Sequence, residues 1–155
     1  MDEETLDLAP LQEVLEEYKT KQGAVIPVLQ KAQEIYGWLP EEVLKAVAVG
    51  MNVPLSKIYG VATFYSQFYL KRRGRHIVQQ CDGTACHVRG AGRIIEAVEK
   101  HLGIKAGETT PDYRLTYEVV YCLGSCGLAP VAMVDDKMVG QLVPEKMIEV
   151  LDSLQ

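Results

Sequence analysis

The sequence has no excess of basic charge and no long hydrophobic run, and each shortage excludes a class of protein. The formal net charge of −5 argues against a nucleic-acid-binding surface, which needs Lys and Arg to neutralise phosphates. The start of the chain, Met1–Thr5, is acidic and lacks the basic residues and apolar core of a secretory signal. No apolar run is long enough to span a bilayer. We therefore expect a cytoplasmic protein without direct membrane insertion, in a compartment where thiols stay reduced.

Motifs that bind nucleotides are also missing. The Gly-rich segment 83–92 lacks the order Gly-x-Gly-x-x-Gly that opens a helix after a strand, and no Walker-type phosphate loop is present. A thioredoxin-type dithiol would need Cys-x-x-Cys, which does not occur. We expect this chain to bind neither NAD nor flavin, and we assign no catalytic acid, base or nucleophile.

The first part of the chain, residues 1–70, predicts a small helical bundle. Apolar residues recur there at helical spacing, with charged residues on the opposite faces. Such helices must bury their apolar stripes on one another or on a partner. The predicted helices cover residues 11 to about 23, 25–36, 41–51 and 54–59.

The segment Val61–Leu70 breaks this pattern, because it is rich in aromatic and β-branched residues and predicts extended chain or strand. Its aromatic side chains either form a partner interface or fill the core. We expect core positions for alternate members and contact positions for the rest. The aromatic residues are Phe64, Tyr65, Phe68 and Tyr69. The basic turn Lys71–Arg75 follows and marks the boundary between the two parts.

The second part, residues 71–155, predicts a compact α/β layer, because strand and helix patterns alternate along it. The predicted elements are a strand at 76–80, a helix at 91–102, a strand at 115–121, a hairpin of 131–134 and 138–142 that turns at 135–137, and a helix that starts at Pro144.

All four cysteines lie in this second part, as Cys81-x4-Cys86 and Cys122-x3-Cys126. Each pair follows the end of a predicted strand. If the two strands are neighbours, their loops bring the four thiolates together at one edge of the sheet. Glycines at positions 83, 124 and 127 allow tight loops whose backbone N–H groups can donate to sulfur.

Several kinds of site compete for these cysteines. Disulfides would need an oxidising compartment, for which the chain has no signal. Structural zinc also takes four thiolates, although zinc knuckles usually use two-residue spacers. A Rieske-type site would draw on two of the three histidines, His76, His87 and His101, but four cysteines make them unnecessary. On chemistry alone the spacers favour an iron–sulfur cluster and leave zinc open.

A resemblance narrows this choice. The motif Cys81-x4-Cys86, followed by the segment 121–130 with its sequence YCLGSCGLAP, resembles the thioredoxin-like [2Fe–2S] ferredoxin family. Within that family it is similar to the small subunit that accompanies the flavin-bearing NADH dehydrogenase subunit of respiratory complex I. Related subunits occur in NAD(P)-linked hydrogenases and formate dehydrogenases. The segments 26–40 and 59–68 are similar to the helical extension of that subunit.

The resemblance implies one [2Fe–2S] cluster, with Cys81 and Cys86 on one iron and Cys122 and Cys126 on the other. It implies a thioredoxin-like ferredoxin domain at 71–155, and a helical bundle at 1–70 that docks on a flavin- and NAD(P)-binding partner subunit. The expected function is transfer of single electrons to or from the partner's flavin. Two alternatives stay open at this point: a zinc-stabilised interaction module and a free-standing ferredoxin. Which complex this subunit would belong to is also left undecided by the sequence.

Overall fold

The computed structural model describes residues 6–155, so the acidic start Met1–Thr5 lies outside the described residues. The chain divides into two compact units between Arg72 and Arg73, and each unit has its own hydrophobic core. Lys71 and Arg72 thus belong to the first unit, slightly beyond the predicted division at residue 70.

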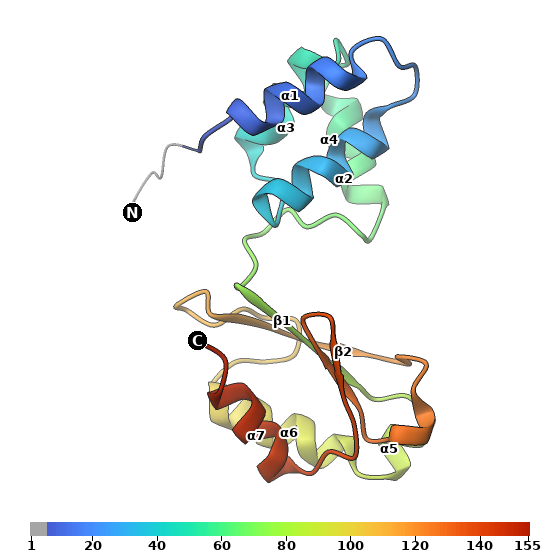
Figure 1. The fold of residues 1–155 in the computed structure, drawn as a ribbon, viewed down its shortest axis with the longest axis vertical. Coiled ribbons are helices and arrows are strands. Elements are labelled where there is room, and N and C mark those ends of the chain that lie inside the picture. The colour runs from blue at the N-terminus through green and yellow to red at the C-terminus, as the bar shows by residue number, and fades with distance from the viewer. Residues whose placement is uncertain (1–5) are drawn as a thin grey trace. The chain divides into compact units, whose positions relative to one another are not determined.

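The first unit is a bundle of α1 (Ala9–Tyr18), α2 (Val25–Tyr36), α3 (Glu41–Gly50) and α4 (Leu55–Phe64) (Figure 1). Helix α2 ends where predicted, because Gly37 adopts the left-handed conformation and its N–H caps the carbonyl of Gln33. The apolar faces of all four helices meet in one core. Its fully buried members include Leu11, Val28, Val43, Val47 and Ile58.

The prediction of extended chain over Val61–Leu70 is wrong for its first part, because α4 continues to Phe64. Ile58 and Ala62 lie one turn apart and are both buried, so packing of this helix face outweighs the β-propensity of its residues. Residues 65–70, which follow α4, are neither helix nor strand. The Gln33 side chain bonds the backbone there, at Gln67 O and Tyr69 N, both at 2.7 Å.

The second unit is built on a four-stranded sheet with the order β2-β1-β3-β4. Strands β1 and β2 are parallel, whereas β3 is antiparallel to both of its neighbours. Helices α6 and α7 pack against each other on one face of this sheet (Figure 1). The elements are β1 (His76–Cys81), α5 (Thr84–Val88), α6 (Ala91–Leu102), β2 (Leu115–Val120), the 3₁₀ turn η1 (Cys126–Leu128), β3 (Ala132–Val134), β4 (Lys137–Val139) and α7 (Pro144–Asp152).

Most elements of the predicted α/β layer are confirmed. Helix α6 has the predicted bounds and ends at Gly103, which is left-handed. The hairpin turns at Asp135, where φ is 53°, and its second strand is shorter than predicted. Two short elements, α5 and η1, were not predicted, and each of them carries a cysteine.

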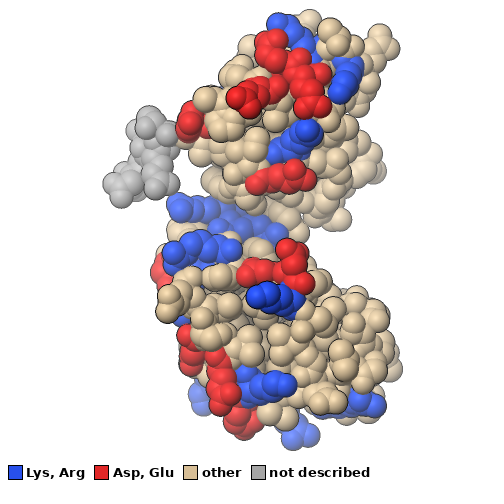
Figure 2. Space-filling view, viewed as in Figure 1, with Lys and Arg blue, Asp and Glu red and all other residues tan. Residues whose placement is uncertain are grey.

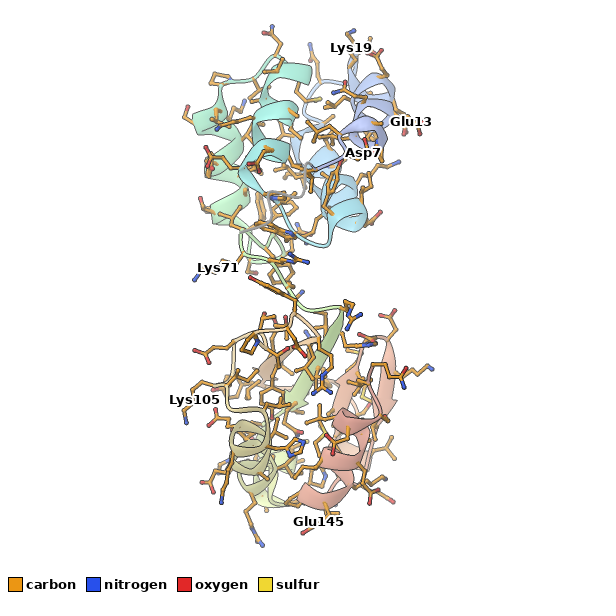
Figure 3. All side chains as sticks on the ribbon, turned by 90° about the vertical axis from the view of Figure 1, so that its left-hand side faces the viewer. Asp7, Glu13, Lys19, Lys71, Lys105 and Glu145 are labelled. Atoms are coloured by element: carbon orange, nitrogen blue, oxygen red, sulfur yellow. The ribbon has the colours of Figure 1, made fainter. Side chains whose placement is uncertain are left out.

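Charged side chains of both signs lie on the surface of each unit (Figure 2). The labelled residues Glu13 and Lys19 of the first unit and Lys105 and Glu145 of the second point outward (Figure 3). Between residues 6 and 155, no helix combines the length and the apolar character that crossing a membrane requires.

Candidate metal centre

The sheet register brings the two cysteine pairs to the same edge. Strands β1 and β2 run parallel with Cys81 opposite Val120, so both strands end at one level. Cys122 follows two residues after that level, and the N–H of Asp82 bonds the carbonyl of Val120 at 2.8 Å. The condition for one shared site, that the two strands are neighbours, is therefore met, and the loops that carry the cysteines emerge side by side.

The first pair is enclosed by protein. Cys81 and Cys86 are only 2% and 1% exposed. Cys81 closes β1, and Cys86 lies in α5, which starts directly after Gly83. A Cβ on Gly83 would lie 3.1 Å from Tyr121 O and 3.5 Å from Cys81 Sγ, so the loop needs a glycine to pass this closely.

The second pair is exposed to solvent. Cys122 lies in the loop after β2, and Cys126 begins the 3₁₀ turn η1. Gly124, between them, has φ 75°, a left-handed conformation that glycine adopts without strain. The two pairs thus differ in environment, the first inside the unit and the second at its surface.

Backbone N–H groups donate to one sulfur of each pair. The Gly83 N–H lies 3.4 Å from Cys81 Sγ, and the Gly124 N–H lies 3.3 Å from Cys122 Sγ. Two of the three glycines singled out in the sequence therefore serve as sulfur donors. Such bonds stabilise thiolate and shift the potential of a bound cluster.

A backbone contact that helps to place Cys81 was missed by sequence reasoning. The Cys81 N–H donates to the carbonyl of Val131 at 3.0 Å. Val131 lies just before β3 and is itself buried. No sequence signal distinguishes it from other valines at strand starts, because the bond depends on how β1 and the start of β3 meet.

All four cysteines line a single cavity of 510 Å³, here called the cysteine cavity. It lies at the end of the unit where α5 is labelled in Figure 1. The nonpolar side chains of Val88 and Tyr121 lie at its opening and are 79% and 78% exposed. The remaining lining residues are Gly83, Thr84, Ala85 and Arg89.

The thiols of the cavity oppose one another's ionisation. Burial raises the pKa of Cys86, the nearby backbone of Val131 lowers it, and the neighbouring Cys81 thiol raises it further. The pKa of Cys126 is raised first by its hydrogen bond with Cys122 and then by the negative charge of that thiolate. Four thiolates in one cavity therefore require bound cations to balance their charge.

The arrangement suits a two-iron unit better than one ion. Among the other thiols, Cys81 raises the pKa of Cys86 most and Cys122 raises that of Cys126 most, so the sulfurs form two pairs. In the described part of the chain, no group of three or more His, Cys, Asp or Glu side chains is arranged around a single metal ion. A structural zinc site needs four protein ligands around one point, whereas each iron of a two-iron cluster would take two thiolates from the protein and two bridging sulfides.

The histidines are engaged elsewhere. His76 bonds Asp135 at 2.9 Å and His101 bonds Asp152 at 2.7 Å. His87 lies in α5 and bonds Asp82 at 2.8 Å. None of the three belongs to the described lining of the cysteine cavity, so the Rieske-type alternative has no support.

Comparisons with known proteins agree with this site. Residues 11–155 match the family described as thioredoxin-like [2Fe-2S] ferredoxin. The chain is 39% identical, over 88% of its length and 80% of the relative's, to the NADP-reducing hydrogenase subunit HndA of Solidesulfovibrio fructosivorans. It is also 39% identical, over 99% of its length and 93% of the relative's, to a subunit of the NADH-quinone oxidoreductase of Rickettsia conorii.

The fold is shared with a solved structure. A chain in the crystal structure of an air-oxidised NAD⁺-reducing [NiFe]-hydrogenase superposes with a TM-score of 0.70 at 20% identity. The match covers 85% of this chain but only 23% of the hydrogenase chain, so it bears on the fold alone. The family match, by contrast, covers both units and all four cysteines, and the chain belongs to the thioredoxin-like [2Fe–2S] ferredoxin family.

Proposed function

We propose that this protein is an electron-transfer subunit of an NAD(P)-linked oxidoreductase and carries one [2Fe–2S] cluster. The observation that carries the proposal is the single cavity lined by all four cysteines in a member of this family. Relatives that this chain matches over most of their length are named as subunits of NADH-quinone oxidoreductase and of an NADP-reducing hydrogenase. A zinc-stabilised interaction module has no comparable support.

The proposed ligands are the four cysteines, with Cys81 and Cys86 on one iron and Cys122 and Cys126 on the other. This pairing is supported by the pKa shifts of Cys86 and Cys126, to which the other thiol of the same pair contributes more than any thiol of the other pair. When bound, the cluster supplies one-electron redox chemistry. The chain's own residues hold the four sulfurs, donate N–H groups from Gly83 and Gly124, and keep water from Cys81 and Cys86.

Flavin and NAD(P)H chemistry belongs, in this proposal, to a partner subunit, because this sequence lacks a dinucleotide-binding motif. The helical unit is the proposed docking element. Its most exposed aromatic residue is Phe64, at 79%, which is an unusual side chain to leave in water. A cytoplasmic location is part of the same proposal, because the cysteines are free thiols suited to a reducing compartment.

Anaerobic reconstitution of the full chain with iron and sulfide tests the ligand set. We expect two irons and two sulfides per chain and a rhombic electron paramagnetic resonance signal on reduction. Each single Cys→Ser variant should lose or alter that signal. The Ser125→Ala variant, next to Cys126, is the matched control and should retain it. One zinc per chain without sulfide would contradict the proposal.

Affinity for the flavoprotein subunit of the same complex tests the docking role. Phe64→Asp should weaken binding about tenfold or more, because it removes an apolar contact and buries a charge. Val143→Asp is the control, since Val143 is an exposed apolar residue of the second unit. Equal affinities for both variants and the unsubstituted protein would exclude docking through Phe64.

A further inference from the structure

Arg89 brings a positive charge to the cysteine cavity. It follows α5 directly, three positions after Cys86. Among the described residues that line the cavity, Arg89 has the only cationic side chain, and none has a carboxylate. A guanidinium group stays protonated at any pH at which proteins are stable. The cavity that gathers four thiols therefore holds one fixed cation.

A hydrogen bond ties the Arg89 side chain to the segment that follows the second cysteine pair. Its Nη1 donates to the Ala129 carbonyl at 3.4 Å. Ala129 is buried in a small cluster with Cys81 and Cys86, and its own N–H donates to the Cys126 carbonyl at 3.2 Å. Arg89 thus joins two segments that carry cysteines, and this bond restricts the directions in which its long side chain can point.

The proposed cluster is a group that such a cation would stabilise. Two ferric ions, two sulfides and four thiolates sum to two negative charges, and one electron from the partner's flavin adds a third. A nearby fixed cation attracts the more negative, reduced state more strongly than the oxidised one. The Arg89 side chain is exposed, so solvent and salt screen part of this attraction.

We propose that Arg89 raises the reduction potential of the centre by holding a fixed positive charge at the cysteine cavity, with the Ala129 carbonyl as its anchor. This inference rests on the proposed function, because it needs a bound cluster. Arg89 is not a ligand in this proposal, so cluster uptake does not depend on it. The carboxylate of Asp82 would act in the opposite direction, but it bonds His87 at 2.8 Å and lies outside the described lining of the cavity.

The variant that tests this is Arg89→Gln in the full, reconstituted chain. Glutamine keeps an N–H donor but has no charge. We expect full cluster content and a fall of about three- to tenfold in the one-electron reduction equilibrium constant, where tenfold corresponds to about 59 mV. Arg89→Lys keeps the charge without the planar guanidinium and should retain most of the potential. Redox titration followed by paramagnetic resonance measures both variants.

Ionic strength separates the effect of charge from that of shape. The Debye length falls from about 30 Å at about 0.01 M salt to about 3 Å at about 1 M. The difference in potential between the unsubstituted protein and Arg89→Gln should therefore shrink as salt is added. The matched control is Arg93→Gln, which removes an exposed arginine of α6 outside the described lining of the cavity. It should leave the potential unchanged.

Two results would overturn the inference while leaving the proposed function intact. One is an Arg89→Gln protein with full cluster content and an unshifted potential. The other is an equal fall in Arg89→Gln and Arg89→Lys, which would assign the effect to the shape of the side chain. Failure of the unsubstituted chain to take up a [2Fe–2S] cluster would instead overturn the proposed function.

A second variant, Val88→Lys, covers the case in which Arg89→Gln does not fold. Val88 lines the same cavity and is 79% exposed, so this substitution leaves the core unchanged. A second cation at the cavity should raise the reduction equilibrium constant about two- to fivefold. A cluster-loaded Val88→Lys protein with an unshifted potential would show that charge at this opening does not act on the centre, and would overturn the inference.

Discussion

Single backbone N–H groups set the chemistry of the cysteine cavity. Those of Gly83 and Gly124 lie within 3.4 and 3.3 Å of Cys81 and Cys122 sulfur. Gly124 can aim its N–H there because it holds φ at 75°, a conformation that costs other residues roughly 1–2 kcal/mol. The site therefore depends on the conformational freedom of this glycine as well as on its thiols.

Substituting Gly124 with alanine should move that N–H away from Cys122. We expect a loss of about 1 kcal/mol in stability from backbone strain and a more negative reduction potential, because one sulfur donor is lost. Chemical denaturation and redox titration of the reconstituted protein measure the two effects. The control is Gly92→Ala within α6, where nothing lies within 4 Å of the new Cβ. This change should stabilise the helix slightly and leave the potential alone.

His76 gives the second unit a pH-dependent stability. Its Nδ1 lies 2.9 Å from Asp135 and its Nε2 lies 2.9 Å from Gln155 O. The pKa of His76 is raised by the Asp135 hydrogen bond first and the Gln155 carbonyl second. The protonated ring is therefore favoured in the folded state. Its stabilising contribution is complete below the unfolded pKa of about 6.5 and is lost as pH rises through the higher folded pKa.

Denaturant unfolding of the second unit should accordingly become easier as the pH rises above about 6.5. His76→Gln should flatten this dependence, because glutamine keeps polar contacts but does not titrate in this range. Hydrogen-exchange rates of the 73–155 segment, corrected for intrinsic pH effects, provide a second measurement. An unchanged pH profile in the variant would show that His76 does not carry the effect.

At the scale of elements, the sequence predicted the long amphipathic helices well. Helices α2 and α6 have the predicted bounds, since apolar stripes and left-handed glycines, Gly37 and Gly103, mark them. The strand patterns predicted β1 and β2 and showed that each leads into a cysteine, whereas their parallel pairing is a long-range contact that these patterns do not specify. The four cysteines were found by their spacing and by resemblance.

Elements shorter than about two turns could not be predicted from periodicity. Helix α5 has five residues and η1 has three, too few to show an apolar stripe. The extension of α4 to Phe64 depends on burial of Ala62 in the bundle core, which local propensity does not encode. The hydrogen bonds of the Gln80 side chain to the carbonyls of Cys81 and Val131 depend on how β1 and β3 meet, so no single stretch of sequence predicts them.

The loop before α7 supports the turn that carries Cys126. The N–H of Gln141 bonds the Leu128 carbonyl at 2.7 Å, and the N–H of Leu142 bonds the Pro130 carbonyl at 2.9 Å. A Cβ on Gly140 would lie 2.7 Å from Leu128 Cβ. Element η1 therefore rests directly against this glycine.

Gly140→Ala should displace η1 and loosen Cys126. We expect a stability loss of about 1–3 kcal/mol from overpacking and faster loss of iron to a chelator. Thermal unfolding and the rate of bleaching in the visible spectrum measure these effects. Gly60→Ala serves as the control, because nothing lies within 4 Å of its new Cβ in α4. Bleaching at the same rate in both variants would mean that η1 adjusts without moving Cys126.

At the scale of the whole molecule, the two units have separate cores and need not unfold together. One core consists of residues from the helical bundle and the other of residues from the sheet and its helices. All proposed cluster ligands lie in the second unit. Metal ligation and folding should therefore be coupled in that unit alone.

Removing iron and sulfide from the full chain should expose this difference. We expect amide hydrogen exchange to accelerate across residues 73–155, most strongly around the cysteine loops, while the helices of 9–64 keep their protection. Mass spectrometry of the exchanged protein measures both regions in one experiment. Equal acceleration in both units would indicate a single cooperative structure.

Because the two cysteine pairs are unequally buried, damage to the centre should reach the exposed pair before the buried pair. Oxygen, chelators and reducing agents meet Cys122 and Cys126 at the surface, while Cys81 and Cys86 lie behind them. With the proposed ligand set, attack would therefore begin at the iron held by Cys122 and Cys126, and these exposed thiols, once released, would be the first to oxidise. Repair would proceed in the opposite order, from a sheltered pair already in place outward. A partner subunit that covers this opening would thus protect the centre from damage as well as exchange electrons with it.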